Sequence, residues 1–167
     1  MPDSIVLENL TRYYGDFLAL DHLNIQIRRG ENVALLGPNG AGKSTALKIL
    51  CGVLRPSGGR ALINGTDVMK DREKAVKNIG VILETPEFYP FLTPVEILQY
   101  LGRLRGMSGR GLERRIKEVL ELVGLKRWGG VKIEKFSRGM KQRLGLAQAL
   151  LHDPPILILD EPALGLD

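Results

Sequence analysis

The amino-acid sequence predicts an α/β fold with a mostly parallel core sheet. Short apolar runs that read as strands alternate along the 167 residues with segments of helical periodicity. A glycine-rich loop at 37–42 separates one apolar run from a helical segment, and another apolar run, at 156–159, leads directly into two carboxylates. A chain of about this length buries roughly two-thirds of its unfolded surface, so one domain with a substantial core is expected.

The first third of the chain reads as three strands, a loop and a helix. Residues 4–10 and 23–27 have the character of strands, and apolar residues alternate with polar ones in the second run. The apolar run 33–36 lies between two glycines, which predicts a strand buried on both faces. Beyond the glycine-rich loop a helix is expected over 44–51, because Gly52 provides a stop signal.

The next segment predicts a hairpin, a short helix and another strand. Residues 60–63 and 66–68 flank an Asn-Gly dipeptide, which is typical of a tight hairpin turn. A short charged helix is expected around 71–77, and a strand over 79–83.

Two helices are expected in the stretch that follows. Thr93 can cap a helix over about 94–104, because proline occupies the first helical position and Glu96 the third, as in a capping box. Apolar residues then recur at helical spacing over 112–123, and Gly124 is the stop.

The chain closes on one more helix and one more strand. Ser137 can cap a helix that runs to about residue 151. Residues 156–159 read as a last buried strand. No internal repeat, low-complexity tract or heptad series interrupts this alternation.

Composition and charge narrow the class of protein. The net charge is +5, but residues 101–145 hold 13 basic and 4 acidic residues, a balance of +9, which leaves −4 for the rest. A basic segment can face the phosphates of nucleic acid or lipid, or can simply be a solvated helical face.

No apolar run approaches the about 20 residues that cross a bilayer, and residues 1–4 do not open a signal peptide. Cys51 is the only cysteine, and its apolar helical context predicts a buried structural thiol.

The loop at 37–44 has the sequence Gly-Pro-Asn-Gly-Ala-Gly-Lys-Ser and matches G-x-x-x-x-G-K-[ST] at every required position. Glycines let backbone N–H groups turn inward, and the following helix directs its positive end at the same place, so the loop is expected to bind phosphate. Lys43 should reach the β- and γ-phosphates, and the Ser44 hydroxyl should ligate Mg²⁺. The residues expected to hold the nucleotide here are Gly37, Asn39, Gly40, Ala41, Gly42, Lys43, Ser44 and Thr45.

Two carboxylates follow the last strand. At the carboxyl end of a parallel strand, Asp160 can hold Mg²⁺ directly or through water. Glu161 is then placed to polarise the attacking water as a general base. A solvent-exposed strand end is the alternative reading, but the phosphate loop upstream favours the functional one.

The stretch between these motifs is the most specific signal. Residues 136–143, Phe-Ser-Arg-Gly-Met-Lys-Gln-Arg, resemble the L-S-G-G-Q-x-Q-R signature of ABC ATPases. The resemblance extends over essentially the whole of 1–167, read as a partial nucleotide-binding domain of the P-loop NTPase class. It implies an antiparallel β subdomain and a helical subdomain inserted at about 86–150. It also implies that Ser137 and Gly139 contact the γ-phosphate held by a partner subunit.

The same resemblance assigns further residues. Tyr14 looks like the aromatic that stacks on adenine, and Tyr13 is a second candidate for that role. A half-exposed strand aromatic is the alternative reading of Tyr14. Residues 164–167 resemble the loop that joins two protomers. The family usually has glutamine after the strand at 79–83, where it touches Mg²⁺ and water, but this sequence has Glu84. The catalytic residues expected from the resemblance are therefore Lys43, Glu84 and Glu161, and the Mg²⁺ ligands are Ser44, Glu84 and Asp160.

Other positions depart from the family pattern. Arg138 replaces a glycine of the signature and Met140 replaces its glutamine. The segment 84–90 resembles export ATPases of the bacitracin-resistance kind. The three aromatic residues at 88–91 are a docking patch for a membrane partner on one reading and core filler on the other.

The family resemblance implies an ATPase that drives transport of a substrate across a membrane. The implied partners are a second ATPase protomer and transmembrane permease subunits, and the implied location is cytoplasmic, on the inner face of the membrane. A soluble ABC ATPase that acts on ribosomes or nucleic acid is an alternative, motivated by the basic segment, although nucleic acid is not the expected partner. A nucleotide-binding remnant without hydrolysis is another.

The family pattern continues beyond Asp167 with a strand that carries a switch histidine. The chain therefore looks truncated, and neither His22 nor His152 is in position to replace that histidine. We expect the 167-residue chain by itself to hydrolyse ATP poorly and to have low solubility.

Overall fold

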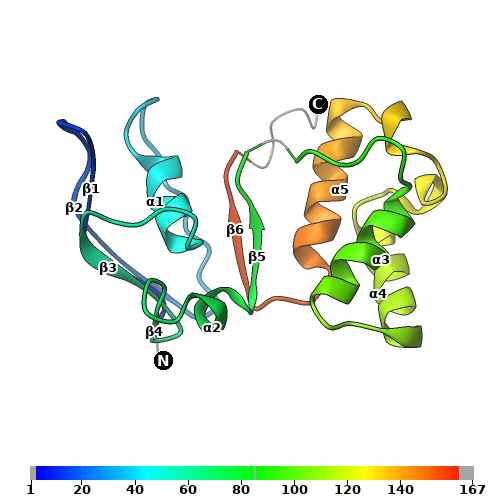
Figure 1. Ribbon diagram of the computed structural model, residues 1–167, viewed down its shortest axis with the longest axis horizontal. Coiled ribbons are helices and arrows are strands. Elements are labelled where there is room, and N and C mark those ends of the chain that lie inside the picture. The colour runs from blue at the N-terminus through cyan, green and yellow to red at the C-terminus, as the bar shows by residue number, and fades with distance from the viewer. Residues whose placement is uncertain (1–2, 85, 162–167) are drawn as a thin grey trace. The chain divides into compact units, whose positions relative to one another are not determined.

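A computed structural model describes residues 3–84 and 86–161, and these residues form two compact units. One unit is Met1–Asn78 and the other Ile79–Asp167 (Figure 1). Both combine helices with strands, so the predicted α/β class is confirmed.

The first unit is built on an antiparallel sheet. Its strands are β1 (Asp3–Tyr14), β2 (Phe17–Arg28), β3 (Gly58–Ile63) and β4 (Thr66–Asp67), in the order β2-β1-β3-β4. β1 and β2 extend beyond the runs predicted at 4–10 and 23–27, because their pairing continues to the turn between Tyr14 and Phe17. The β3–β4 hairpin is confirmed, and its turn residues Asn64 and Gly65 have φ of 48° and 75°, as a tight primed turn requires.

The β1–β2 ladder contains a bulge that matters for the site. Arg12 pairs with Leu20, but its neighbour Tyr13 pairs with Leu18, so Ala19 is an extra residue on β2. A bulge of this kind bends its strand and turns a backbone group away from the ladder. Here the extra residue lies beside the glycine-rich loop.

The prediction of a strand at 33–36 is wrong. Residues 31–38 carry no strand in the structure, and the side chains of Val33 and Leu36 are 52% and 91% exposed. A strand exists only when a neighbouring strand accepts and donates its backbone hydrogen bonds. Within the described residues, no strand pairs with this run, so apolar composition alone does not make it one.

Two helices complete the first unit. α1 (Lys43–Leu50) buries one side of its surface, including Ala46 and Ile49. Cys51 follows it and is buried as predicted, and this burial raises the pKa of its thiol to about 12. The short helix α2 (Arg72–Val76) confirms the charged helix predicted at 71–77, and Asp71 caps it by accepting from the Lys74 N–H at 3.2 Å.

The second unit joins a parallel strand pair to a group of helices. β5 (Ile79–Ile82) pairs with β6 (Ile156–Leu159), although 73 residues separate them in the chain. The helices are α3 (Pro94–Leu104), α4 (Gly109–Leu122) and α5 (Arg138–Leu150), with short 3₁₀ turns at Lys126–Trp128 and Ile133–Lys135. All of these elements except the 3₁₀ turns were predicted. The separate helical subdomain at about 86–150 stays a prediction.

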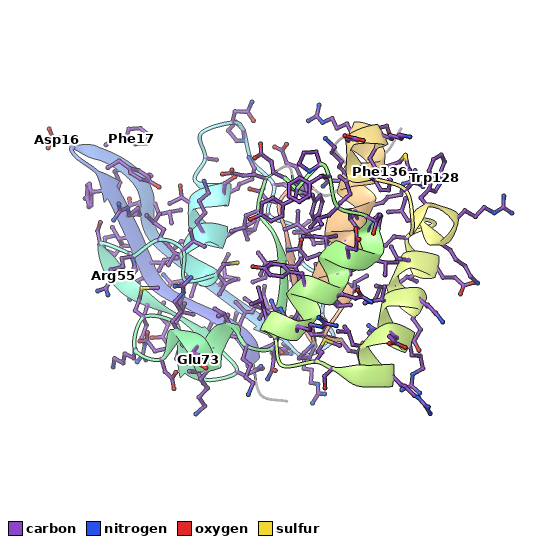
Figure 2. All side chains as sticks on the ribbon, turned by 45° about the vertical axis from the view of Figure 1, so that its right-hand side comes forward. Asp16, Phe17, Arg55, Glu73, Trp128 and Phe136 are labelled. Atoms are coloured by element: carbon purple, nitrogen blue, oxygen red, sulfur yellow. The ribbon has the colours of Figure 1, made fainter. Side chains whose placement is uncertain are left out.

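The helices of the second unit enclose one apolar core. Its fully buried side chains come from all three helices and from the turns between them, and include Leu98, Ile116, Leu125, Ile133 and Leu144. Phe136 joins this core, and its ring meets that of Trp128 edge-on, with centroids 6.4 Å apart and an angle of 82° between the planes (Figure 2). This core fixes the position of the residue that begins α5.

The capping box predicted at the start of α3 is present. Thr93 Oγ1 accepts from the Glu96 N–H at 3.3 Å, and the Glu96 carboxylate accepts from the Thr93 N–H at 2.8 Å and from its hydroxyl at 2.9 Å. The backbone N–H of Thr93, followed by its hydroxyl, lowers the pKa of Glu96. The ionised carboxylate therefore stabilises the fold at pH values above the ordinary glutamate pKa of 4.5, and this contribution is lost as the pH falls through the lowered value.

Replacing Thr93 with alanine is expected to lower the free energy of unfolding by about 1 kcal/mol at pH 7. The deficit should shrink in acid, below the pKa of Glu96, because part of it comes from the hydroxyl that donates to the carboxylate. Urea unfolding followed by circular dichroism at pH 7 and at pH values below 4.5 measures both effects. Ser108→Ala is the matched control, because Ser108 is the N-cap of α4 and makes no side-chain capping bond. Equal losses for the two variants would contradict the assignment.

Candidate functional site

Lys43 closes the glycine-rich loop of the first unit. Its side-chain Nζ donates to the carbonyl oxygens of Gly37 at 2.7 Å and Pro38 at 2.9 Å. The Ala41 N–H also donates to the Pro38 carbonyl, at 3.2 Å. The lysine therefore spans the loop that it follows in sequence, and its ammonium group lies over the loop's backbone.

Gly42 permits a close approach between this loop and the sheet. Its φ is 82°, and a Cβ on it would lie 2.4 Å from the Ala19 carbonyl oxygen and 2.7 Å from Leu20 Cδ2. No side chain fits there, and the backbone conformation also favours glycine. The close approach of the Ala19 bulge therefore requires glycine at position 42, which the motif by itself does not indicate.

The first turn of α1 offers backbone donors. Gly42 is the N-cap and has no side chain to satisfy them, and the helical bonds begin with Ala46 N–H to the Gly42 carbonyl at 2.9 Å. The amides of Lys43, Ser44 and Thr45 precede that first bond and have no acceptor within the helix. Together with the helix dipole they form an anion-binding surface, and the side chains of Asn39 and Ser44 are exposed beside it.

Tyr14 lies at the end of the β1–β2 hairpin. It pairs with Phe17 across the turn, its side chain is 44% exposed, and the Arg12 guanidinium carbon lies 4.8 Å from its ring centroid. Within the first unit, the tip of this hairpin and the loop before α1 lie at the same end (Figure 1). Tyr13 is 45% exposed, so exposure does not separate the two tyrosines. The contact with Arg12 distinguishes them, because it is made by the ring of Tyr14.

In the second unit the structure brings three predicted carboxylates to one sheet edge. β5 and β6 are parallel with Ile82 beside Leu159, and the Asp160 N–H donates to the Ile82 carbonyl at 2.8 Å. Glu84 follows β5, and Asp160 and Glu161 follow β6. Because the carboxyl ends of parallel strands meet at the same edge, these residues leave the pair together.

Two of these carboxylates have unusual backbones. The φ angles of Glu84 and Glu161 are 86° and 46°. The other described non-glycine residues with positive φ are asparagine, aspartate or histidine, which tolerate this region better. Strained backbone of this kind gathers at functional sites, where the surrounding structure holds it in place. Nothing in the local sequence indicated it.

A small open cavity of about 200 Å³ lies beside Glu84. Residues of β5, the segment after it and α5 line it, including Pro86, Gly145 and Gln148. A Cβ on Gly145 would lie 2.4 Å from Pro86 Cγ, so α5 packs closely against the segment that follows Glu84. Gln148 is a lining residue that the sequence did not predict, and its only signal is a polar residue three positions after that glycine.

The signature segment begins α5 as predicted. Ser137 is the N-cap, and its Oγ accepts from the Met140 N–H at 3.2 Å. Ser137 and Arg138 are exposed, whereas Gly139 is half-buried and Gln142 is buried. The exposed serine and the first amides of α5 therefore lie on the surface of this unit, open to an approaching molecule.

The aromatic residues after Glu84 divide between surface and core. Tyr89 and Phe91 are 56% and 62% exposed and their rings are 5.8 Å apart, whereas Phe88 packs against the helical core. The core reading therefore holds for Phe88, and docking of a membrane partner by Tyr89 and Phe91 stays a prediction. The predicted protomer-joining loop at 164–167 lies outside the described residues. Among the residues that are described, no helix is both long and apolar enough to span a membrane.

The chain resembles known proteins along nearly its whole length. The profile of the family described as ABC transporter matches residues 20–164. The uncharacterized ABC transporter ATP-binding protein YhcH of Bacillus subtilis is 45% identical over 100% of this chain and 54% of its own length. The bacitracin transport ATP-binding protein BcrA of Bacillus licheniformis is 43% identical over the same shares of the two chains, 100% and 54%. The chain thus spans about half the length of these relatives.

Solved structures share the fold. One, described as the ATP-binding subunit of an ABC transporter, matches with a TM-score of 0.87 at 36% identity, over 96% of this chain and 67% of that one. Another is a dimeric post-hydrolysis state of the ATP-binding cassette MJ0796 bound to ADP and Pi. It matches with a TM-score of 0.86 at 30% identity, over 98% of this chain and 76% of that one.

Proposed function

Because the chain belongs to the ABC transporter family, we propose that it binds ATP with Mg²⁺ and, in a protein that pairs two such domains, hydrolyses ATP to drive transport. The loop at 37–45 carries the proposal. Lys43 spans its backbone, Gly42 leaves no room for a side chain, and the first amides of α1 are unsatisfied within the helix. This combination of a point charge and inward amides suits the β- and γ-phosphates.

Ser44 and Asp160 are the proposed protein ligands of Mg²⁺. The described residues contain no cluster of three acidic, histidine or cysteine side chains that would hold a metal by themselves. Mg²⁺ in phosphoryl-transfer sites takes one or two protein groups and completes its shell with phosphate oxygens and water, so the residues present suit it. When bound, the ion neutralises charge on the phosphates. Glu84 is proposed as a further ligand in the place of the usual glutamine.

Glu161 is the proposed general base. It follows Asp160 directly, is exposed, and is held at a φ of 46°, so its carboxylate leaves the end of β6 where the Asp160 backbone is fixed to β5. A carboxylate at such a position can orient water and accept its proton. Lys43 stabilises the developing charge of the transferred phosphoryl group.

A second protomer is the proposed source of the remaining contacts. Ser137 and the first turn of α5 would approach the γ-phosphate bound by the partner, with Gly139 allowing close contact. The open helix start described above supports this role, and the similar cassette MJ0796 is described as dimeric. Tyr14 is proposed to stack on the adenine.

We further propose that the protein works at the inner face of the cell membrane with permease subunits and exports an antimicrobial compound. The name of a relative supports this class of cargo, since BcrA is described as a bacitracin transport protein. The exposed Tyr89 and Phe91 are candidates for the permease contact.

The test of the nucleotide proposal is calorimetric titration of the full-length gene product. ATP and tripolyphosphate are both expected to bind in the presence of Mg²⁺, whereas adenosine at the same concentrations should give no signal, because the phosphates supply most of the contacts. EDTA should weaken ATP binding. Equal affinity for ATP and adenosine, or binding of neither, would contradict the proposal.

A further inference from the structure

We propose that Arg12 is a positioning residue for the base of the nucleotide, which braces one face of the Tyr14 ring so that the other face is held ready to stack on adenine. This inference rests on the proposed function, since it takes Tyr14 as the residue that meets the base. It adds a residue whose role neither the motifs nor the family resemblance assigned.

The contact itself is a cation over a ring. The Arg12 guanidinium carbon is 4.8 Å from the Tyr14 centroid, inside the about 6 Å at which such pairs attract. Arg12 and Tyr14 are two residues apart on β1, so the pleat of the strand directs both side chains to one face. The guanidinium carbon lies over one face of the ring, and the residue stays 44% exposed.

The arginine is held from the opposite direction. Its Nη1 donates to the Arg55 carbonyl at 3.0 Å, in the loop between α1 and β3 (Arg55 is labelled in Figure 2). The same loop binds the strand a second time, because the Ser57 hydroxyl oxygen accepts from the Tyr13 N–H at 3.0 Å. Arg12 is therefore tethered by its tip rather than extended into water.

One donor of Arg12 is left unsatisfied by this arrangement. Its Nε is buried and has no hydrogen-bond partner in the part of the chain that the structure describes. A buried donor without an acceptor is unfavourable, and such groups call for an explanation. Attraction to the tyrosine ring offsets this cost, since a cation over a ring face gains electrostatic attraction that does not use that N–H.

Arg12 is also connected to the phosphate loop through the strand opposite it. Arg12 pairs across the ladder with Leu20, and Leu20 and its neighbour Ala19 are the residues that touch Gly42. The tyrosine is thus held on one side by Arg12, and its strand pair is seated against the loop that would hold the phosphates. A tyrosine already fixed relative to a phosphate site loses less conformational entropy when the nucleotide binds, which favours binding.

The charge of Arg12 favours stacking as well. The faces of a tyrosine ring and of a purine are both electron-rich, so two such faces repel each other when they overlap. A cation on the far side of the tyrosine draws electron density toward itself and lessens that repulsion. The effect concerns the base alone and leaves the phosphate contacts unchanged.

The test compares ATP with tripolyphosphate in variants of the full-length gene product. Arg12→Gln is expected to weaken ATP binding about three- to tenfold, from the lost cation–ring attraction and the lost ordering of the ring, while tripolyphosphate binding stays within error. Arg12→Lys, which keeps the charge, should recover part of the loss. In a Tyr14→Ala background, Arg12→Gln should have no further effect on ATP affinity. Arg28→Gln, which removes an exposed charge at the far end of β2, is the matched control and should bind both ligands normally.

The possible results separate the inference from the function beneath it. Equal losses for ATP and tripolyphosphate in Arg12→Gln overturn the inference, because Arg12 would then act on phosphate or on folding. The inference is also overturned if Arg12→Gln weakens ATP binding further in the Tyr14→Ala background. Wild-type ATP binding that Tyr14→Ala leaves unchanged overturns the inference while the nucleotide proposal stands. A wild-type protein that binds neither ligand overturns both.

Discussion

Lys43→Ala is expected to weaken ATP binding at least about 100-fold. The variant lacks the charge-assisted contacts of Lys43 with the β- and γ-phosphates, each worth about 1.5–3 kcal/mol. Because each 1.4 kcal/mol corresponds to a tenfold change in affinity, the loss of these contacts gives a fall of this size. In this protein the variant would also lose the two bonds by which Nζ holds the Gly37 and Pro38 carbonyls, so the loop itself would be less ordered. Calorimetric titration of the full-length gene product with ATP and Mg²⁺ measures the loss.

The control for this prediction is Lys74→Ala. Lys74 is an exposed lysine of α2 in the same unit, so the variant removes the same charge without touching the loop. It should bind ATP as the wild type does. If Lys43→Ala bound ATP within about threefold of the wild type, the assignment of Lys43 to the β- and γ-phosphates would be wrong.

Glu161→Gln is expected to lower ATP turnover by about 10²–10⁴-fold, the usual contribution of a general base. ATP affinity should stay within a few-fold, because the amide preserves the size of the side chain and the phosphate loop is unaltered. Bound ATP should therefore persist, and the complex should be recovered with intact triphosphate. Phosphate release and the identity of the bound nucleotide, both measured on the full-length gene product, test the two parts of the prediction.

Glu113→Gln is the matched control, since Glu113 is an exposed glutamate of α4 in the same unit. Its turnover should equal that of the wild type. A Glu161→Gln protein that still released phosphate within about threefold of the wild-type rate would exclude Glu161 as the base. Glu84 would then be the next residue to replace, because it leaves the neighbouring strand at the same edge.

The predictions from sequence succeeded where the signal is local. The capping box of Thr93 and Glu96, the cap of α5 at Ser137 and the Asn64-Gly65 turn each depend on residues within a few positions of one another. The backbone geometry that these residue types allow is fixed by their own chemistry, so a single sequence is enough to recognise it. The phosphate-binding role of the loop at 37–45 stays a prediction.

The prediction at 33–36 failed for the complementary reason. Its apolar residues and flanking glycines describe a buried strand well, but a strand also needs partners, and none pairs with it in the described residues. The pairing of β5 with β6 shows the opposite outcome. Their apolar runs were recognised separately, and only folding brought them side by side in a parallel register.

Local sequence is enough to recognise the chemical groups and their immediate backbone: the glycine-rich loop with Lys43, the acidic end of β6, and the caps that begin α3 and α5. The tertiary structure alone decided how distant residues meet. The Ala19 bulge against Gly42 and the bond that tethers Arg12 to the Arg55 carbonyl both depend on such meetings. Contacts between residues far apart in the chain depend on packing and on ladder register, which no short segment encodes.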